Sequence, residues 1–300
     1  MFDGPAINEL IALLERRSVS LYHACQYDDF RAYLRLGGIP SRALLEGSRQ
    51  CFTPFETDAY DRHNGVWDKV FVNLADFGEW FARGLCAVPN PYGPIVLQLR
   101  PAAFREATDV AVCCRSAGAA DFNREREALG RVEDVDRLFR NAADAGFPRS
   151  AYLKMASTAP TPGPAAGMPE VSCTVARGLL PLDYVIVAWT DPYVLGGRPL
   201  RAWVGEAMAA AGAGFRLWER SCHEERRPLY AELLAVVQSA EPSLHGIAHD
   251  PTRSPSLRAW AAGVQERGLA YQFRRYRHYL IKGTVDAVDT GGYNNLDRSH

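Results

Sequence analysis

The sequence predicts an α+β protein, and three observations support this class. Short apolar runs of strand character recur between Gly- and Pro-rich turns, for example at 95–99 and 170–175. Stretches with apolar residues at helical spacing lie between them, as at 6–17. Beyond about residue 195 the composition becomes rich in Ala and Leu, which favours helices. We therefore expect a sheet flanked by helices in residues 1–195 and a mainly helical extension in residues 196–300.

The N-terminal segment predicts a helix, a strand and a second helix in this order. Apolar residues repeat along one helical face over 6–17, and residues 19–23 form a short apolar strand that ends in His23. The next helix is expected over 27–36 and should end at Gly37, because glycine readily adopts the left-handed conformation that closes helices.

The middle of the chain supplies the other strands and two irregular segments. Further strands are expected at 69–74, 95–99, 109–114, 170–175 and 183–189. A loop or broken helix is expected at 51–65, one or two helical turns at 76–83, a helix at 122–145, and a surface loop at 159–167. Helices are then expected at 201–211 and 228–238, followed by an Arg- and aromatic-rich stretch at 256–282.

Composition describes an ordinary folded protein. Apolar residues make up 47% of the chain and charged residues 23%, with a net charge of −1, which argues against a generally basic nucleic-acid binder. The first residues lack the features of a secretory signal, and no apolar run reaches the roughly 20 residues of a membrane span. We therefore expect a cytoplasmic location and no membrane partner.

Cysteine usage points to neither a disulfide framework nor a metal cluster. The seven cysteines are an odd number and include no CxxC spacing, so we expect reduced thiols. Asp58, Asp61 and His63 could ligate a metal, but no further ligand cluster accompanies them, and no metal is expected.

Two short segments far apart in the sequence carry the residues best suited to chemistry. His23 ends the first strand, a Gly-Gly-Ile-Pro-Ser-Arg turn at 37–42 follows the next helix, and Glu170 opens a later apolar strand. Cleavage of the bond between nicotinamide and ribose in NAD develops positive charge on the ribose, which a carboxylate stabilises. A histidine can hold a ribose hydroxyl, and an arginine can hold the pyrophosphate. Neither GxGxxG nor GxxxxGK[ST] occurs, so the usual phosphate-binding loops are absent.

In their order and separation these segments resemble the DarT-type ADP-ribosyltransferases, over roughly residues 18–190. The resemblance rests on Leu21-Tyr22-His23, Asp29-Phe30, the turn at 37–42, and the patterns Glu170-Val171-Ser172-Cys173 and Pro181-Leu182-Asp183-Tyr184-Val185. It implies a split central β-sheet flanked by helices. It also implies a mono-ADP-ribosyltransferase that cleaves NAD and transfers ADP-ribose to a nucleobase, of DNA in preference to RNA, as a toxin or phage-defence effector with a possible antitoxin partner. NAD is then a substrate, and no metal is implied.

The resemblance also implies roles for individual residues. Glu170 matches the catalytic glutamate and His23 the NAD-contacting histidine, with Ala24 and Cys25 beside it. Ala32 matches the position at which the family's first helix touches the cofactor, so it is also an expected cofactor contact. The family uses a catalytic arginine between this helix and the next strand; spacing favours Arg62, with Arg49 as the second candidate.

The sequence departs from the family at several positions. Cys25 stands where the family has Thr, Asp29 where it has Asn, and 70–74 replaces an aromatic-rich strand. The extension beyond residue 195 also exceeds the compact family domain. These differences bear mainly on the acceptor, and they leave open a transferase acting on protein or an inactive relative that binds nucleic acid or protein.

Other patterns have simpler interpretations. A Cys–His nucleophile formed by His23 and Cys25 lacks a third group to orient it. The charged run at 121–127 could supply Glu125 or Glu127 as a catalytic group, but it is typical of a solvated helix face. Arginines and aromatics alternate from Arg253 to Lys282, which suits phosphate and base binding or, alternatively, an amphipathic helix docked on the core.

Overall fold

The computed structural model describes most of the chain in separate stretches. These are residues 1–53, 58–76, 92–114, 117, 122–139, 169–192, 194–195, 197–220 and 243–266. The helices are α1 (Pro5–Arg16), α2 (Tyr27–Leu36), α3 (Arg42–Gly47), α4 (Asp58–His63), α6 (Arg124–Glu127), α7 (Val132–Asp136), α8 (Leu200–Ala211), α10 (Leu244–His249) and α11 (Pro255–Glu266). The strands are β1 (Phe2–Asp3), β2 (Leu21–Cys25), β3 (Gly38–Pro40), β4 (Val70–Asn73), β5 (Ile95–Leu99), β6 (Ala107–Cys113), β7 (Glu170–Val175), β8 (Leu179–Pro181), β9 (Val185–Thr190), β10 (Val194–Leu195), β11 (Arg198–Pro199) and β12 (Arg216–Glu219).

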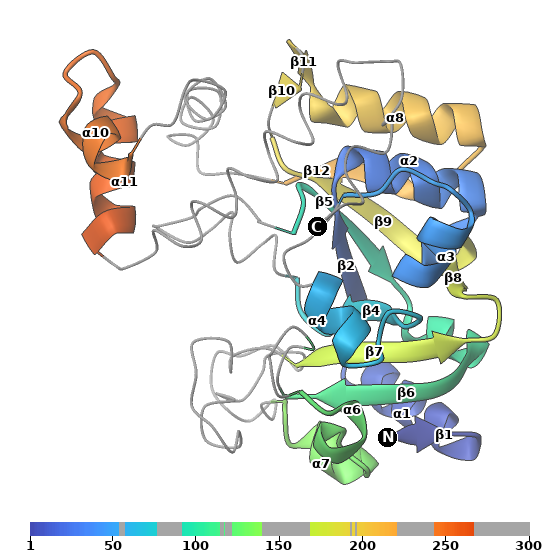
Figure 1. Ribbon diagram of the computed structural model, residues 1–300. Coiled ribbons are helices and arrows are strands. Elements are labelled where there is room, and N and C mark those ends of the chain that lie inside the picture. The colour runs from blue at the N-terminus through green and yellow to red at the C-terminus, as the bar shows by residue number, and fades with distance from the viewer. Residues whose placement is uncertain are drawn as a thin grey trace.

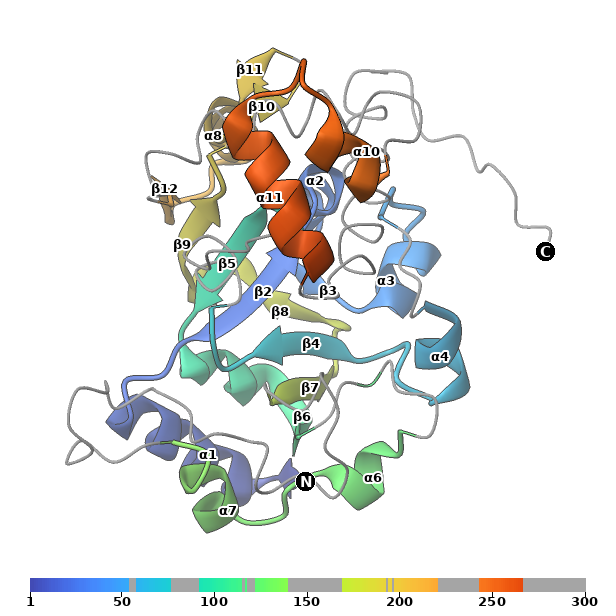
Figure 2. The same cartoon turned by 90° about the vertical axis from the view of Figure 1, so that its left-hand side faces the viewer.

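The central sheet is split into two halves. Within the described residues, eight strands pair in the order β1-β6-β7-β4-β2-β5-β9-β12. A single residue pair between β2 and β4, Tyr22 opposite Asn73, joins the half-sheet β1-β6-β7-β4 to the half-sheet β2-β5-β9-β12 in this part of the chain. Figures 1 and 2 show that the strands of one half run across the direction of those of the other. The predicted α+β class with a split sheet is confirmed.

The helix that follows β2 forms where local sequence signals agree. At its start, the side chain of Gln26 and that of Asp29 satisfy each other's backbone N–H groups, a reciprocal cap that fixes the first turn. At its end, Gly37 has a φ of 74°, a left-handed conformation that glycine adopts without strain. The next helix, α3, begins with Ser41 as its cap, because the side chain of Ser41 accepts a hydrogen bond from the Leu44 N–H.

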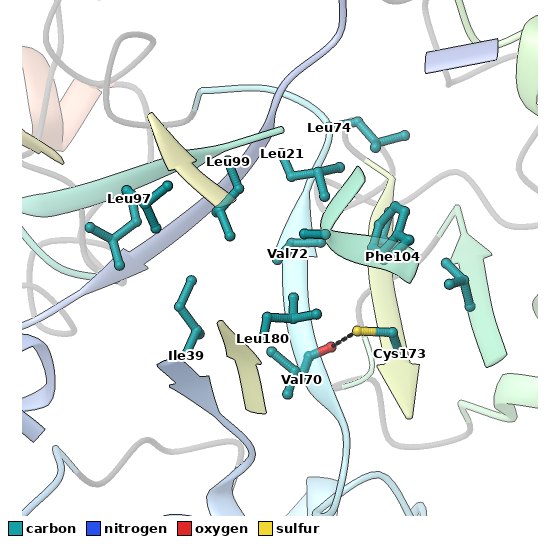
Figure 3. Packing of buried hydrophobic residues seen from close by; sticks show 14 of the residues in the cluster. Leu21, Ile39, Val70, Val72, Leu74, Leu97, Leu99, Phe104, Cys173 and Leu180 are labelled. Atoms are coloured by element: carbon teal, nitrogen blue, oxygen red, sulfur yellow. Dashed lines mark hydrogen bonds between the residues drawn. The ribbon is translucent and has the colours of Figure 1, made fainter. Parts of the chain in front are cut away.

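The main core lies on one side of the split sheet. Figure 3 shows side chains of both half-sheets meeting there, including Leu21 and Leu99 from one half and Val72 and Cys173 from the other. These side chains pack with Phe104 of the 3₁₀ helix Pro101–Glu106. Burial of apolar surface from both halves in one cluster stabilises the split arrangement, since backbone pairing contributes little at the junction.

A second, smaller cluster lies on the other side of the half-sheet β1-β6-β7-β4. It contains the buried residues Val66, Ala111, Cys113, Ala117 and Phe122. Because successive residues of a strand point to opposite faces, Ala111 and Cys113 face this cluster while Val110 and Val112 face the main core.

Most predicted elements of the first 115 residues agree with the structure. The helices expected at 6–17 and 27–36 and the strands expected at 69–74, 95–99 and 109–114 are present within one or two residues of their expected ends. The helix predicted at 122–145 is wrong over its described part, where two short helices, α6 and α7, stand instead. Gly130 separates them, and the carbonyl of Val112 captures the N–H of Leu129, which interrupts the helical pattern.

The strands expected at 170–175 and 183–189 are present as β7 and β9, and the helix expected at 201–211 is present as α8. Four further predictions lie outside the described residues: helical turns at 77–83, a loop at 159–167, a helix at 228–238 and a basic tract at 267–282.

The domain boundary near residue 195 stays a prediction. Beyond it, β12 extends the sheet by parallel pairing with β9, and α10 packs on α11. No helix among the described residues combines the length and apolar character needed to cross a bilayer.

One glycine near the end of β2 is dictated by close backbone approach. Gly93 has a φ of 138°, and a Cβ at this position would collide with the carbonyl of Cys25. Any other residue would push β5 away from β2. The neighbouring Pro94 carbonyl accepts a hydrogen bond from the backbone N–H of Asp191, so this contact would be disturbed as well.

Candidate active site

A row of polar side chains crosses the junction of the two half-sheets. Tyr22 lies opposite Gln98 on β5 and opposite Asn73 on β4, and Asn73 lies opposite Glu170 on β7. Directly paired residues in a sheet share a face, so these four side chains point to the same side of the sheet. We call the four residues the polar row. All four are partly buried. At about 4.8 Å between strands, Glu170 and Tyr22 are about 10 Å apart along the row.

A backbone N–H group holds the glutamate of this row. The Oε1 atom of Glu170 accepts a hydrogen bond of 2.6 Å from the N–H of Ala117. Ala117 belongs to the smaller apolar cluster and is 2% exposed. The carboxylate therefore stands at the first position of β7, where the polar row meets this cluster.

The imidazole of His23 points to the opposite side of the sheet. His23 follows Tyr22 in β2, so it alternates onto the face that packs on α2. Its Nδ1 lies 2.7 Å from the carbonyl oxygen of Phe71 on β4, and its Nε2 lies 3.0 Å from the hydroxyl of Tyr33 on α2. A carbonyl only accepts, so Nδ1 carries the proton and Nε2 accepts from the Tyr33 hydroxyl. The ring thus bridges the half-sheets one residue beyond the joining pair.

The surroundings of His23 favour its neutral form. Burial lowers the pKa of His23 to about 4, although the bond to the Phe71 carbonyl opposes this shift; the nearby positive charge of Arg42 adds to the lowering. With both nitrogens engaged and no charge at neutral pH, His23 acts in this structure as a bridge. The structure does not bring it onto the face that carries Glu170.

The two arginines predicted from spacing lie away from both residues. The guanidinium of Arg62 bonds to the Glu46 carboxylate at 3.2 Å and stacks on the ring of Trp67, 3.6 Å from its centroid. Trp67 donates its own N–H to Glu46 at 3.1 Å, which closes a network at the surface of α3 and α4. Arg49 is exposed just after α3 and has a φ of 54°, a left-handed conformation.

The remaining predicted contact residues differ in accessibility. Ala24 is partly exposed and belongs to the same side of β2 as Tyr22. Cys25 is 1% exposed, and burial followed by the charge of Asp29 raises the pKa of its thiol well above the ordinary value, so it does not serve as a nucleophile. Ala32 is fully buried in the main core, where a ligand cannot touch it as α2 stands.

An arginine that spacing did not single out lies close enough to His23 to lower its pKa. Arg42 begins α3 in the turn at 37–42, and its guanidinium lies 3.9 Å from Asp58 and 5.0 Å from the ring centroid of Phe52. Its charge also counters the effect of burial, which raises the pKa of Asp29. The sequence did contain a signal for Arg42, because it is the last residue of the turn at 37–42. The local pattern does not show, however, that this turn brings Arg42 close to His23.

The charged run at 121–127 is not simply a solvated face. Arg124 is 10% exposed at its side chain and bonds to the hydroxyl and the carbonyl of Ser172 on β7, at 2.8 and 3.1 Å. It also pairs with Asp109 on β6. Burial opposes the shift, but the contacts with the Thr174 side chain and then with Arg124 lower the pKa of Asp109. Arg124 of α6 therefore contacts β7 at Ser172, two residues from Glu170. Glu125 is exposed, as expected.

A buried group of charges connects the end of β4 with the ends of β9 and β12. Arg220 forms two bonds of 2.7 Å with Asp76, and its Nε lies 3.4 Å from Asp191. Arg220 is 5% exposed and Asp191 is 3% exposed. Burial raises the pKa of Asp191 to about 7; the charge of Arg220 opposes this rise and that of Asp76 adds to it. This Arg220 triad, which we define as Asp76, Arg220 and Asp191, is the second side-chain bridge between the half-sheets.

An aromatic pair extends the same region to the sheet edge. Trp189 on β9 and Trp218 on β12 pack edge to face at 5.1 Å between ring centroids, and Trp218 is 44% exposed. The guanidinium of Arg220 lies 5.5 Å from the Trp189 ring, and Trp189 donates its N–H to Gln98 of the polar row at 3.0 Å. Gln98 in turn donates to the Ser20 hydroxyl at 2.9 Å, which fixes the orientation of its amide.

The described part of the chain contains no group of three or more His, Cys, Asp or Glu residues that could hold a metal ion. Cys25, Cys51, Cys113, Cys114 and Cys173, the cysteines in this part, are free thiols.

Comparison with solved structures gives a distant likeness. No family model and no curated protein matches this sequence. Among solved structures, the chain is similar to Thermosipho africanus DarTG in complex with ADP-ribose. The two are 9% identical, the match covers 89% of this chain and 68% of that chain, and the TM-score is 0.37. These values are too low to assign the chain to a family.

Proposed function

We propose that this protein is a mono-ADP-ribosyltransferase that cleaves NAD and transfers ADP-ribose to a nucleobase, in DNA in preference to RNA. The observation that carries the proposal is the position of Glu170. This carboxylate opens a strand at the junction of a split sheet, on a face where Tyr22, Asn73 and Gln98 stand in line with it. The order of the motifs at 21–23, 37–42 and 170–173 supports the same reaction.

In this reaction the bond between C1′ of the ribose and the nicotinamide nitrogen breaks, and its electron pair leaves with nicotinamide. Glu170 would stabilise the positive charge that develops at C1′ and orient the acceptor base, whose nitrogen or oxygen then forms the new bond to C1′. The proton lost by the acceptor would pass to this carboxylate or to water. Tyr22 and Asn73 offer a hydroxyl and an amide for the ribose hydroxyls on the same face.

The proposed roles of the other residues follow the sequence. His23 is proposed to contact the nicotinamide-side ribose, with Ala24, Cys25 and Ala32 near the cofactor, and Arg62 or Arg49 to contact NAD. For His23, Cys25 and Ala32 these roles require that β2 and α2 rearrange, because His23 faces away from Glu170 and the other two are buried in the main core. For Arg62 this role requires that the guanidinium leave Glu46 and Trp67. Arg42 is a third candidate for binding the pyrophosphate, because it is the arginine beside His23. An activity of this kind harms the cell that makes it, so a toxin or phage-defence role with an antitoxin partner belongs to the proposal.

The test is transfer of label from NAD to defined acceptors. Purified protein is incubated with NAD labelled in its adenylate part and with single-stranded DNA, RNA or protein, alongside Glu170→Gln and, as the matched control, Glu125→Gln. We expect labelled nucleic acid with the wild type and the control, and about 10²–10⁴-fold less with Glu170→Gln, because a positioned carboxylate typically contributes this much. Equal transfer by Glu170→Gln and the wild type would refute the proposal. Label on protein alone would redirect it to a protein acceptor.

A second candidate function is nucleic-acid or protein binding without catalysis. The observation in its favour is that His23 and Arg62 are both engaged in contacts within the protein. It predicts that neither wild type nor Glu170→Gln transfers label or consumes NAD, while both bind the same nucleic acid with equal affinity. The same samples therefore separate the two functions.

A further inference from the structure

The carboxylate of Glu170 is tied to α4 through one intervening residue. Ala117 donates its N–H to Glu170 Oε1 at 2.6 Å, and its carbonyl accepts a hydrogen bond of 2.9 Å from the side-chain amide of Asn64. The backbone of Ala117 therefore lies between an amide on one side and the carboxylate on the other. Ala117 is 2% exposed, so water does not readily replace either contact.

Asn64 is itself held firmly at the end of α4. Its N–H bonds to the carbonyl of Tyr60 at 2.8 Å, and the next residue, Gly65, has a φ of 68°. This left-handed turn directs Val66 into the smaller cluster, where Val66 is 1% exposed beside Ala117. A capped helix end and an apolar anchor thus flank Asn64 on both sides.

We propose that Asn64 is a positioning residue that sets the orientation of the Glu170 carboxylate through Ala117. This inference rests on the proposed function of Glu170. A side chain at the first residue of a strand has several staggered rotamers, and a fixed N–H donor selects the one in which Oε1 meets it. Asn64 keeps that donor in place by holding the carbonyl of the same residue. Glu170 then presents its carboxylate to the polar row in a single orientation before any substrate binds.

Asn64→Asp is the sharpest variant because it preserves shape and removes the donor. The aspartate cannot donate to the Ala117 carbonyl and repels it, so the turn at Ala117 shifts and the bond to Glu170 lengthens. We expect kcat for NAD consumption to fall by about 10–100-fold with an unchanged KM, as misplacement of a reacting group does. The acid limb of the pH–rate profile should also move to higher pH, because the carboxylate loses a donor that favours its charged form.

The matched control is Asn8→Asp, the same chemical change on an exposed position of α1. It should leave kcat and the pH profile unchanged. Where Asn64→Asp does not fold, Asn64→Ala removes the donor without adding a charge and carries the same expectation. Unchanged kcat in a folded Asn64 variant, beside an active wild type, would overturn the proposal.

A second measurement makes the inference independent of activity. Hydrogen exchange of the Ala117 amide, followed by NMR, should accelerate in both Asn64→Asp and Glu170→Leu, which lacks an acceptor, but not in Asn8→Asp. If the wild type consumes no NAD, the proposed function fails, and the exchange rates still decide whether Asn64 holds Ala117 against Glu170. Unaltered exchange at Ala117 in Asn64→Asp would overturn the positioning role whatever the activity.

Discussion

Among the described residues, two side-chain bridges span the junction of the half-sheets, and they differ in charge. His23 connects β2 with the Phe71 carbonyl of β4 as a neutral ring with both nitrogens bonded. The Arg220 triad connects the end of β4 with β9 and β12 through ionisable groups, two carboxyls and one guanidinium. Glu170 lies at the β7 end of the polar row, one strand away from the junction, and belongs to neither bridge as defined here. The residues that stabilise the junction are therefore distinct from the one best placed for chemistry.

Removing the charged bridge should have the largest effect on stability. In Arg220→Met, Asp76 and Asp191 stay buried without their cation, and loss of one partner from a buried ion pair typically costs about 3–5 kcal/mol. Chemical denaturation measures the free energy of unfolding. Arg201→Met, on the exposed face of α8, should change it by less than about 0.5 kcal/mol. A loss as small as that of the control would show that the Arg220 triad does not hold the halves together.

Removing the neutral bridge should cost less. His23→Leu leaves the Phe71 carbonyl and the Tyr33 hydroxyl without partners, and we expect a loss of about 2–3 kcal/mol. His249→Leu, on the exposed side of α10, serves as the control in the same denaturation series. The remaining folded protein also tests the proposed role of His23: if His23 only bridges the sheet, NAD consumption per folded molecule should stay within about threefold, whereas a ribose contact should cost more.

The smallest effect is expected from pH in the intact protein, because the two bridges respond in opposite directions. The pKa of His23 is about 4 in the folded protein against an ordinary value of 6.5, so the unfolded chain takes up the proton first and stability falls between pH 6.5 and 4. The pKa of Asp191 is about 7 against 3.8, so the folded protein takes up that proton first and stability rises as the pH falls from 7 to 3.8. These two contributions therefore largely cancel.

Asp191→Asn separates them, because it removes the titration of Asp191 and leaves that of His23. Its free energy of unfolding should fall by about 2–3 kcal/mol between pH 7 and pH 4.5, more steeply than that of the wild type. Denaturant titrations of both proteins at the two pH values measure this. Parallel pH profiles would mean that Asp191 does not carry the opposing contribution.

Sequence patterns predicted the local elements of the site but not how they face one another. The strand that carries His23 and the helix that ends at Gly37 follow from apolar periodicity and glycine, and the strand of Glu170 follows from its apolar run. The faces depend on the register of β4 against both β2 and β7, and register is set by long-range pairing. A shift of one residue would have put His23 in line with Glu170.

The buried arginines escaped prediction for a related reason. Arg124 occupies a charged run that is indistinguishable from a solvated helix until β6 and β7 bring Asp109 and Ser172 against it. Arg220 follows the four-residue strand β12, which is too short to show a clear alternation of polar and apolar residues. Its two carboxylate partners are Asp76 and Asp191. In both cases the partner is more than ten residues away, so no local window contains the ion pair.

The contact between Trp189 and Trp218 has an optical consequence. Two indoles set edge to face at 5.1 Å couple their excited states, and such coupling gives a paired positive and negative band in the near- and far-ultraviolet circular dichroism. Because Trp218 sits on the outermost strand and Trp189 on its neighbour, this band reports whether the last strand is docked, separately from the signal of the helices. The protein thus carries a built-in spectroscopic reporter at the edge of its sheet.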